Sequence, residues 1–186
     1  MPFIETDIPG LHVFEPNVFE DSRGYFFESY NEKVFRDAGI DFCWVQDNQS
    51  SSAYGVVRGL HYQLPPFAQS KLVRVLRGKI LDVVVDIRTG SPTYGKSYSK
   101  VLSAKNKRQL FIPKGFAHGF SVLNEKAEVI YKCDEYYNKE SEAGIIYNDP
   151  ELNIDWRIPG DKIIVSDKDQ QLPLLKDCKN SFVFGS

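Results

Sequence analysis

Residues 71–87 read KLVRVLRGKILDVVVDI, with two β-favouring runs on either side of a turn at residues 77–79. The second run contains consecutive valines at 83–85, and β-branched side chains of this kind fit a pleated sheet surface. Two such runs around a short break that contains glycine are typical of a β-hairpin. We therefore predict that Lys71–Leu76 and Ile80–Ile87 are strands that pair with each other.

Further β-favouring runs occur at short intervals along most of the chain, separated by glycine and proline turns. They are Val56–Gln63, Tyr98–Leu102, Gln109–Ile112, Ala117–Leu123 and Glu128–Cys133. Many short strands at this spacing are typical of a sandwich or of a closed barrel of the jelly-roll kind. A length of 186 residues suits one domain with a substantial core. We therefore predict an all-β jelly roll that forms a single domain over residues 1–186.

Helices are expected only as short segments toward the two ends of the chain. Residues 1–27 hold short apolar runs broken by glycine and proline, a pattern that indicates early strands. Ser29–Glu32 then has the form of a helix capping box, and Gly39 supplies a stop. We predict a short helix between them, and a few short helices in the C-terminal part of the chain.

The composition is that of an ordinary globular protein. A formal net charge of −2 gives no reason to expect nucleic acid or an acidic membrane as a partner. The N-terminus lacks a basic stretch before an apolar run, and no apolar stretch reaches the length of a membrane span. The three cysteines, Cys43, Cys133 and Cys178, are far apart and form no C-x-x-C pair. We therefore predict a reduced, cytoplasmic protein without a thiolate zinc site.

The segment Arg58–Gln63 places His61, one of only three histidines, among a guanidinium, a phenol and an amide. Because imidazole titrates near neutral pH, this side chain is suited to serve as a general base or a metal ligand. In a regular strand Arg58 and His61 would face opposite sides, whereas a bulge at Gly59, or a strand that starts there, would bring both into one cavity. We interpret His61 as a catalytic base.

The spacing around His61 resembles a cupin metal motif from which ligands are missing. Gly55, five residues and His61 match the opening of that motif, but Gln63 stands at the second histidine of its H-x-H pair. No glutamate occurs between residues 64 and 76, although Pro113–His118 resembles the second cupin motif, P-x-G-x-x-H. Two histidines are too few for a tight first-row metal site, which normally uses three or four protein ligands. We therefore predict that no metal is bound.

Together with these two partial cupin motifs, further segments of the chain resemble the dTDP-4-dehydrorhamnose 3,5-epimerase family. The matching segments, which follow the order found in the family, are Asp21–Glu28, Gln46–Ser50, Arg58–Gln63, Gln69–Arg74, Pro113–Phe120, Tyr131 with Tyr137, and Ser166–Asp169. The resemblance implies a cupin-like jelly roll, a homodimer and an isomerase that needs no cofactor. The implied reaction is epimerisation of a dTDP-4-keto-6-deoxyhexose at C3 and C5, which converts dTDP-4-dehydro-6-deoxy-D-glucose to dTDP-4-dehydro-L-rhamnose.

The resemblance assigns a role in proton transfer to four side chains. His61 removes a proton from a carbon next to the ketone, and a carboxylate orients its ring. That carboxylate is Asp169 by resemblance, while Asp167 is the rival from the sequence alone. Lys71 is the positive donor to the enolate oxygen. Tyr131 is the acid on the opposite face, because an ordinary phenol stays protonated at neutral pH.

The resemblance also implies a set of contacts with the nucleotide sugar. Arginine and lysine suit the phosphates, aromatic rings suit stacking, and amides and carboxylates suit thymine or sugar hydroxyls. His118 is implied near the ketone, with a structural role as the alternative. The predicted substrate-binding residues are Arg23, Phe26, Glu28, Gln46, Asn48, Arg58, His118, Tyr137, Glu142 and Lys168.

Strand parity leaves the role of one acidic residue open. Asp82 and Asp86 share a strand face with Val84. If that face is the barrel interior, Asp82 is a second polar partner in the site. If it is the outer face, both carboxylates are ordinary solvated groups.

Other functions remain as alternatives to the 3,5-epimerase. One is a monofunctional epimerase that acts at C3 or at C5 of the same class of substrate. Another is a metal-dependent cupin oxygenase. A third is a non-catalytic protein that binds sugar nucleotides, although such a protein has no use for an acid placed opposite a base.

Overall fold

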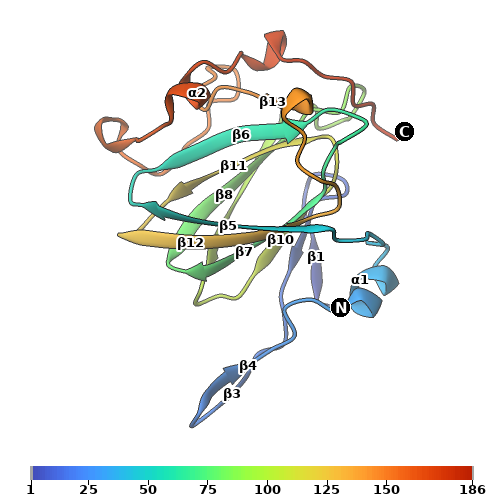
Figure 1. Cartoon of the computed structure of the whole chain (residues 1–186), viewed down its shortest axis with the longest axis vertical. Coiled ribbons are helices and arrows are strands. Elements are labelled where there is room, and N and C mark those ends of the chain that lie inside the picture. Colours follow the sequence, from blue (N-terminus) through green and yellow to red (C-terminus); the bar gives the residue numbers. More distant parts are fainter. Residues whose placement is uncertain (1, 186) are drawn as a thin grey trace.

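Two antiparallel β-sheets face each other in the computed structural model, which describes residues 2–185 (Figure 1). The six-stranded sheet has the order β1 (Phe3–Glu5), β2 (His12–Phe14), β10 (Gln109–Ile112), β7 (Lys71–Arg77), β12 (Lys126–Cys133) and β5 (Gln46–Ala53). The five-stranded sheet has the order β13 (Glu142–Gly144), β6 (Val57–Gln63), β11 (Phe116–Val122), β8 (Lys79–Asp86) and β9 (Ser97–Ser103). The predicted all-β jelly roll is confirmed.

The predicted hairpin of Lys71–Leu76 with Ile80–Ile87 is wrong. β7 pairs with β10 and β12, whereas β8 pairs with β11 and β9, so the two runs belong to different sheets. The chain passes between the sheets at Gly78, where φ is +79° and an added Cβ would lie 2.1 Å from the carbonyl oxygen of Lys126. The local pattern predicts both strands and the turn, but it cannot show which long-range partner each strand finds.

β8 is a central strand of the fold, and both of its faces are buried. Ile80 and Val84 belong to the core between the two sheets. Leu81, Val83 and Val85 face the other way and pack under the C-terminal segment, with residues such as Ile145 and Trp156. Figure 1 shows this segment covering the outer face of the five-stranded sheet. A strand buried on both faces reads as a continuous apolar run, which explains the valine series.

The helices are few and short, as predicted. Helix α1 (Glu32–Asp37) buries Phe35 against Phe14, Leu72 and Phe111. Its N-cap is Asn31, whose side chain accepts a hydrogen bond from the Val34 amide, so the capping box starting at Ser29 places the cap too early. The C-terminal part holds α2 (Asp167–Gln170) and the 3₁₀ turns η1 (Lys139–Ser141), η2 (Gly160–Lys162) and η3 (Leu175–Asp177). Within residues 2–185 no helix has the length and apolar character needed to cross a membrane.

The hairpin of β3 (Phe19–Asp21) and β4 (Gly24–Phe26) forms a separate two-stranded sheet that projects away from the two main sheets (Figure 1). Phe19 is 65% exposed and Phe26 is 68% exposed. The hairpin therefore presents apolar aromatic area that the rest of the described chain leaves uncovered.

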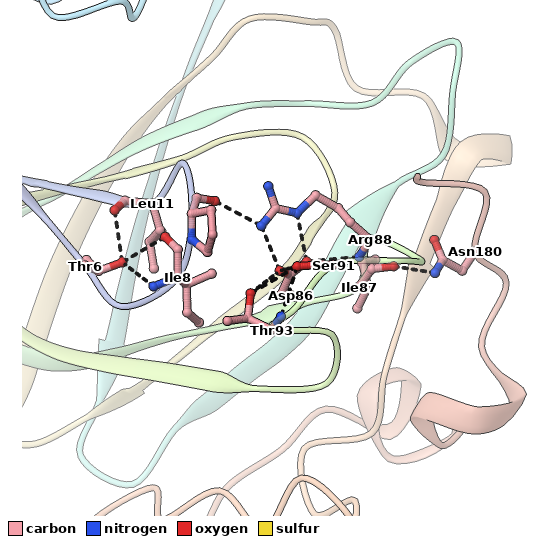
Figure 2. A network of polar contacts seen from close by, with 10 residues as sticks. Thr6, Ile8, Leu11, Asp86, Ile87, Arg88, Ser91, Thr93 and Asn180 are labelled. Atoms are coloured by element: carbon pink, nitrogen blue, oxygen red, sulfur yellow. Dashed lines mark hydrogen bonds and ion pairs between the residues drawn. The ribbon is translucent and has the colours of Figure 1, made fainter. Parts of the chain in front are cut away.

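A buried polar network fixes the rim of the jelly roll (Figure 2). Asp86 accepts hydrogen bonds from Arg88, Ser91 and Thr93, and Arg88 also donates to the carbonyl of Pro9 at 2.9 Å. Burial acts to raise the pKa of Asp86, but these hydrogen bonds outweigh it and leave the pKa below its ordinary value. Both oxygens of this carboxylate therefore hold the turn that follows β8, and Arg88 links that turn to the N-terminal loop at Pro9.

Candidate active site

A cavity of about 430 Å³ lies between the two sheets beside α2. It collects six of the residues that the sequence predicts for the site, from both sheets and from α2. Its lining consists of Ser50, Val56, Val57, Arg58, His61, Lys71, His118, Gly119, Phe120, Tyr131, Ile164, Val165, Ser166 and Asp169.

A bulge at Gly59 brings Arg58 and His61 to the same cavity, as the sequence suggested. His61 pairs with His118 and Arg58 pairs with Phe120, so two residues of β6 stand opposite the single Gly119 of β11. Gly59 has φ of +108°, and an added Cβ would lie 2.6 Å from the carbonyl oxygen of His118. The position therefore requires glycine, both for its backbone angle and for the close approach of β11.

His61 is held by Asp169 from α2. The His61 Nε2 and the Asp169 Oδ1 are 2.8 Å apart, and the Gly59 amide donates to the Asp169 Oδ2 at 3.1 Å. Ser166 caps the helix by accepting from the Asp169 amide at 3.1 Å. Asp169 is 5% exposed, whereas the rival Asp167 is exposed to solvent.

The electrostatic setting keeps Asp169 ionised. Burial acts to raise its pKa, but the hydrogen bond and the charge of His61 outweigh burial, and the Gly59 amide and Ser166 add to them. The pKa of Asp169 is therefore lowered. A carboxylate that accepts from one imidazole nitrogen leaves the other nitrogen with a lone pair, which is what a general base needs.

Tyr131 and Lys71 stand on the opposite wall, on the neighbouring strands β12 and β7. The Lys71 Nζ lies 5.9 Å from the centre of the Tyr131 ring. Burial is the main cause that raises the pKa of Tyr131, so its phenol stays protonated at neutral pH. Burial also lowers the pKa of Lys71, against the opposing charges of Cys133, Asp82 and Glu142. The cavity thus has a histidine–carboxylate pair on one wall and a phenol with an amine on the other.

His118 forms a second histidine–carboxylate pair, with Asp82. The His118 Nε2 and the Asp82 Oδ1 are 2.9 Å apart, and both residues are buried. Asp82 lies on the same face of β8 as Val84, which packs in the core between the two sheets. Of the two orientations that strand parity allowed, the structure therefore shows the inward one. Asp82 faces the interior, while Asp86 is bound up in the rim network.

A smaller cavity of about 150 Å³ shares His61, Lys71 and Tyr131 with the larger one. It is otherwise lined mainly by polar groups of the predicted substrate-binding set: Gln46, Asn48, Tyr137 and Glu142, together with Tyr62, Gln63 and Gln69.

Hydrogen bonds join this polar set to one another. The Tyr137 amide donates to Gln46 at 3.0 Å, and Gln46 donates to Asn48 at 3.0 Å. Glu142 accepts from the Tyr137 hydroxyl at 3.0 Å and from Lys168 at 2.6 Å. Burial acts to raise the pKa of Glu142, but these two partners outweigh it and the pKa is lowered.

Gln63 has a structural use in place of the missing cupin ligand. Its amide donates to the carbonyls of Phe67 and Tyr136 at 2.6 and 3.2 Å, and its oxygen accepts from the Asn138 amide at 2.8 Å. The loop that carries Tyr137 is therefore tied to β6. Within residues 2–185 no three His, Cys, Asp or Glu side chains gather in a group that could hold a metal ion.

Two serines of β5 belong to the site and are absent from the predicted set. Ser50 lines the larger cavity, and Ser52 accepts from the Arg58 Nε at 3.1 Å. The sequence contains a signal that could have identified them, because polar side chains recur with a period of two at Gln46, Asn48, Ser50 and Ser52. This period predicts that the four side chains share one face of a strand.

Arg23, Phe26 and Glu28 line neither cavity. Arg23 lies on the projecting hairpin and pairs with Asp21 at 2.5 Å. Glu28 follows the hairpin and accepts from the Asn31 side chain at 3.2 Å. The chain's own fold therefore does not bring these predicted residues to the site.

Comparison with known proteins agrees with this architecture. The family model described as dTDP-4-dehydrorhamnose 3,5-epimerase matches residues 5–177. The dTDP-4-dehydrorhamnose 3,5-epimerase of Shigella flexneri is 54% identical over 170 residues, which are 91% of this chain and 93% of the relative.

Solved structures of the same family superpose closely on the chain. The epimerase from Elizabethkingia anophelis NUHP1 has a TM-score of 0.91 at 52% identity, covering 94% of this chain and 96% of its own. The enzyme from Legionella pneumophila Philadelphia 1, solved in complex with dTDP-4-keto-L-rhamnose, has a TM-score of 0.90 at 49% identity and covers 94% and 93%. Fold and relatives together define a cupin-like isomerase. The chain belongs to the dTDP-4-dehydrorhamnose 3,5-epimerase family.

Proposed function

We propose that this protein epimerises dTDP-4-dehydro-6-deoxy-D-glucose at C3 and C5 to give dTDP-4-dehydro-L-rhamnose, without a cofactor. The observation that carries the proposal is the cavity in which the His61–Asp169 pair faces Tyr131 across the space between the sheets. The complex of the Legionella relative with dTDP-4-keto-L-rhamnose supports the class of ligand.

His61 begins the reaction as the general base. Its free ring nitrogen takes the proton from the carbon next to the ketone, and the electron pair of the C–H bond passes into an enolate. Ionised Asp169 stabilises the resulting imidazolium. Tyr131 then donates its proton to the same carbon from the opposite face, which inverts the centre. His61 returns its proton to solvent and the tyrosinate takes one up, so that the cycle can repeat at the second carbon.

The enolate oxygen needs donors that are already in place when the charge develops. Lys71, Arg58 and His118 line the cavity between base and acid. Arg58 is oriented by its hydrogen bond to Ser52, so its remaining donors are available to the sugar or the pyrophosphate. Preorganised donors of this kind supply a large share of the rate enhancement in enolate chemistry.

The polar set at the smaller cavity suits the nucleotide part of the substrate. Lys168 provides positive charge for the diphosphate, and Gln46, Asn48 and Glu142 provide donors and acceptors for thymine or sugar hydroxyls. The Tyr137 ring is 56% exposed and offers a surface for stacking on the base. Because both cavities share His61, Lys71 and Tyr131, one ligand can occupy them together.

We further propose a homodimer in which the β3–β4 hairpin of one subunit serves the cavity of the other. Arg23, Phe26 and Glu28 line neither cavity of their own chain, and the exposed aromatic side chains of the hairpin need a partner surface. Light scattering in solution tests the dimer, and a monomer at micromolar concentration would contradict it.

We also propose a cytoplasmic location and a single domain over residues 1–186. The three cysteines are free, which suits a reducing compartment. Cell fractionation and limited proteolysis test these two points. Recovery outside the cytoplasm, or release of a stable folded fragment, would contradict the respective proposal.

The deciding experiment is the reaction in deuterated water with dTDP-4-dehydro-6-deoxyglucose. We expect solvent deuterium at both C3 and C5 of the product. Exchange at one carbon alone would identify the monofunctional epimerase. Tight dTDP binding without any exchange would identify a binding protein, and stoichiometric iron, manganese or zinc after purification would favour the oxygenase.

A further inference from the structure

Lys71 lies at the end of a strand, where the ladder of backbone hydrogen bonds stops. It is the first residue of β7, and it pairs with Ile112 and Cys133, which are the last residues of β10 and β12. The end of a strand opens more readily than its centre, because fewer hydrogen bonds hold it. An amine that has to meet a developing negative charge therefore needs support beyond the ladder itself.

The carboxylate of Asp134 closes this end of the sheet. Asp134 follows β12 directly, and its side chain is 4% exposed. Its Oδ1 accepts from the Ser70 amide at 2.6 Å, and its own amide donates to the Ser70 carbonyl at 3.4 Å. The side chain thus takes the place of the next backbone carbonyl in the ladder, and it fixes the residue immediately before Lys71.

The other oxygen of Asp134 reaches the strand on the far side of β7. Its Oδ2 lies 3.2 Å from the Nζ of Lys114, which is in the connection between β10 and β11. β10, β7 and β12 are neighbours in the six-stranded sheet. One carboxylate therefore joins the ends of three adjacent strands at the point where Lys71 enters the cavity.

The buried backbone of Ser70 depends on this carboxylate. Ser70 is fully buried, and its hydroxyl has no hydrogen-bond partner in the part of the chain that the structure describes. A buried amide without an acceptor is costly, so the backbone would move if the side chain of Asp134 were removed. Movement of Ser70 carries Lys71 with it, because the two residues are consecutive.

Resting on the proposed function, we propose that Asp134 is a positioning residue that, through the Ser70 amide, holds the Lys71 amine where the negative charge of the enolate develops. Lys71 lines both cavities, and its amine lies beside the ring of Tyr131. Asp134 lines neither cavity, so it acts on the reaction through the backbone that precedes Lys71. An enolate donor that is held in place before the charge develops needs no reorganisation during the reaction.

Two substitutions of Asp134 separate its hydrogen bond from its charge. Asp134→Ala removes the acceptor of the Ser70 amide, so we expect kcat to fall by about 10²-fold, as for a displacement of about 1 Å, with dTDP affinity unchanged. Asp134→Asn keeps an oxygen for that amide, so kcat should recover most of this loss. Equal losses in the two variants, or a loss of dTDP affinity in place of kcat, would overturn the proposal.

A Lys71→Met background tests whether the effect passes through Lys71. In this background Asp134→Ala is expected to cost little further kcat, because the amine that it positions is already gone. The Tm should still fall, since the Ser70 amide loses its acceptor in either background. An equal fractional loss of kcat in both backgrounds would refute the role.

Amide hydrogen exchange measures the supporting bond without any turnover. We expect the Ser70 amide to exchange slowly in the wild-type protein and in Asp134→Asn, and at least about tenfold faster in Asp134→Ala. A rapidly exchanging Ser70 amide in the folded wild-type protein would overturn the proposal, whether or not any variant folds. Failure of the wild-type protein to incorporate deuterium into the sugar would instead refute the epimerase function, since the amide measurement does not depend on that reaction.

Asn106→Ala is the matched control, because Asn106 supports backbone amides at the opposite end of β10. Its Oδ1 accepts from the amides of Ser103 and Arg108, both at 3.1 Å, and it lines neither cavity. We expect a lower Tm in this variant, with kcat and the exchange of the Ser70 amide unchanged. If Asn106→Ala lowers kcat as much as Asp134→Ala does, the loss is a general result of weakened strand ends and the proposal fails.

Discussion

The bulge at Gly59 can be tested with a single methyl group. In Gly59→Ala the new Cβ would lie 2.6 Å from the His118 carbonyl oxygen and 2.8 Å from the Gly119 Cα, and both are backbone atoms of β11. Neither can rotate away, so β6 and β11 must separate. A φ of +108° adds strain for any residue with a side chain.

The expected cost follows from these two contributions. Backbone strain of about 2 kcal/mol and one lost ladder hydrogen bond of about 1 kcal/mol together give roughly 3 kcal/mol. For a chain of this size that corresponds to a fall in Tm of about 6–12 °C. The displacement also moves His61 and its partner Asp169, and a shift of about 1 Å in a catalytic group costs on the order of 10²-fold in kcat.

Gly90→Ala is the matched control for the strain alone. Gly90 also has a positive φ, +83°, but an added Cβ would meet nothing within 4 Å. We expect a loss of about 1 kcal/mol and full activity in this variant. Thermal unfolding and deuterium incorporation are measured side by side for both proteins. If Gly59→Ala keeps the wild-type Tm and kcat, the bulge is not what aligns the site.

Three further changes test other parts of the site. Tyr131→Phe should lower product formation by about 10²–10⁴-fold while His61 still removes protons, which the ratio of solvent exchange to product will show. Because the pKa of Asp169 is lowered on folding, its contribution to stability is present above the ordinary aspartate value near 3.9 and is lost as pH falls through the lower folded value. Asp169→Asn should therefore weaken the acid sensitivity seen in denaturant titrations between neutral and acidic pH, and unchanged sensitivity would argue against this linkage. Mixing inactive His61→Ala subunits with Arg23→Ala subunits should restore activity, since one site of each mixed dimer then has both an intact cavity and an intact hairpin; no recovery would contradict the shared site.

The sequence predicts the elements well because their signals are local. Alternating and continuous apolar runs identify the strands, and a glycine between residues that must share a face identifies the bulge at Gly59. Pairing is not local. β7 and β8 are neighbours along the chain, yet they lie in opposite sheets because each finds better long-range partners in β10, β12, β11 and β9.

In the candidate site, too, some features could be predicted from the sequence and others could not. Motif resemblance assigns His61 and Asp169 to one site although 107 residues separate them in the chain, and the structure brings them to 2.8 Å. Strand parity alone cannot predict whether Asp82 points inward, because it shows which residues share a face of the strand but not which face is buried. The place of Arg23, Phe26 and Glu28 could not be predicted from one chain, because their hairpin leaves the body that holds the cavity.

The hydrogen bonds of Gln63 limit which residues its position can accept. It stands at the second histidine of the cupin metal motif, and its side chain forms three hydrogen bonds to the loop around Tyr136 and to Phe67. A Gln63→His substitution would create the H-x-H spacing and, in the same step, remove the hydrogen bonds that tie down the loop carrying Tyr137. One side chain at this position therefore cannot be both a metal ligand and the anchor of that loop.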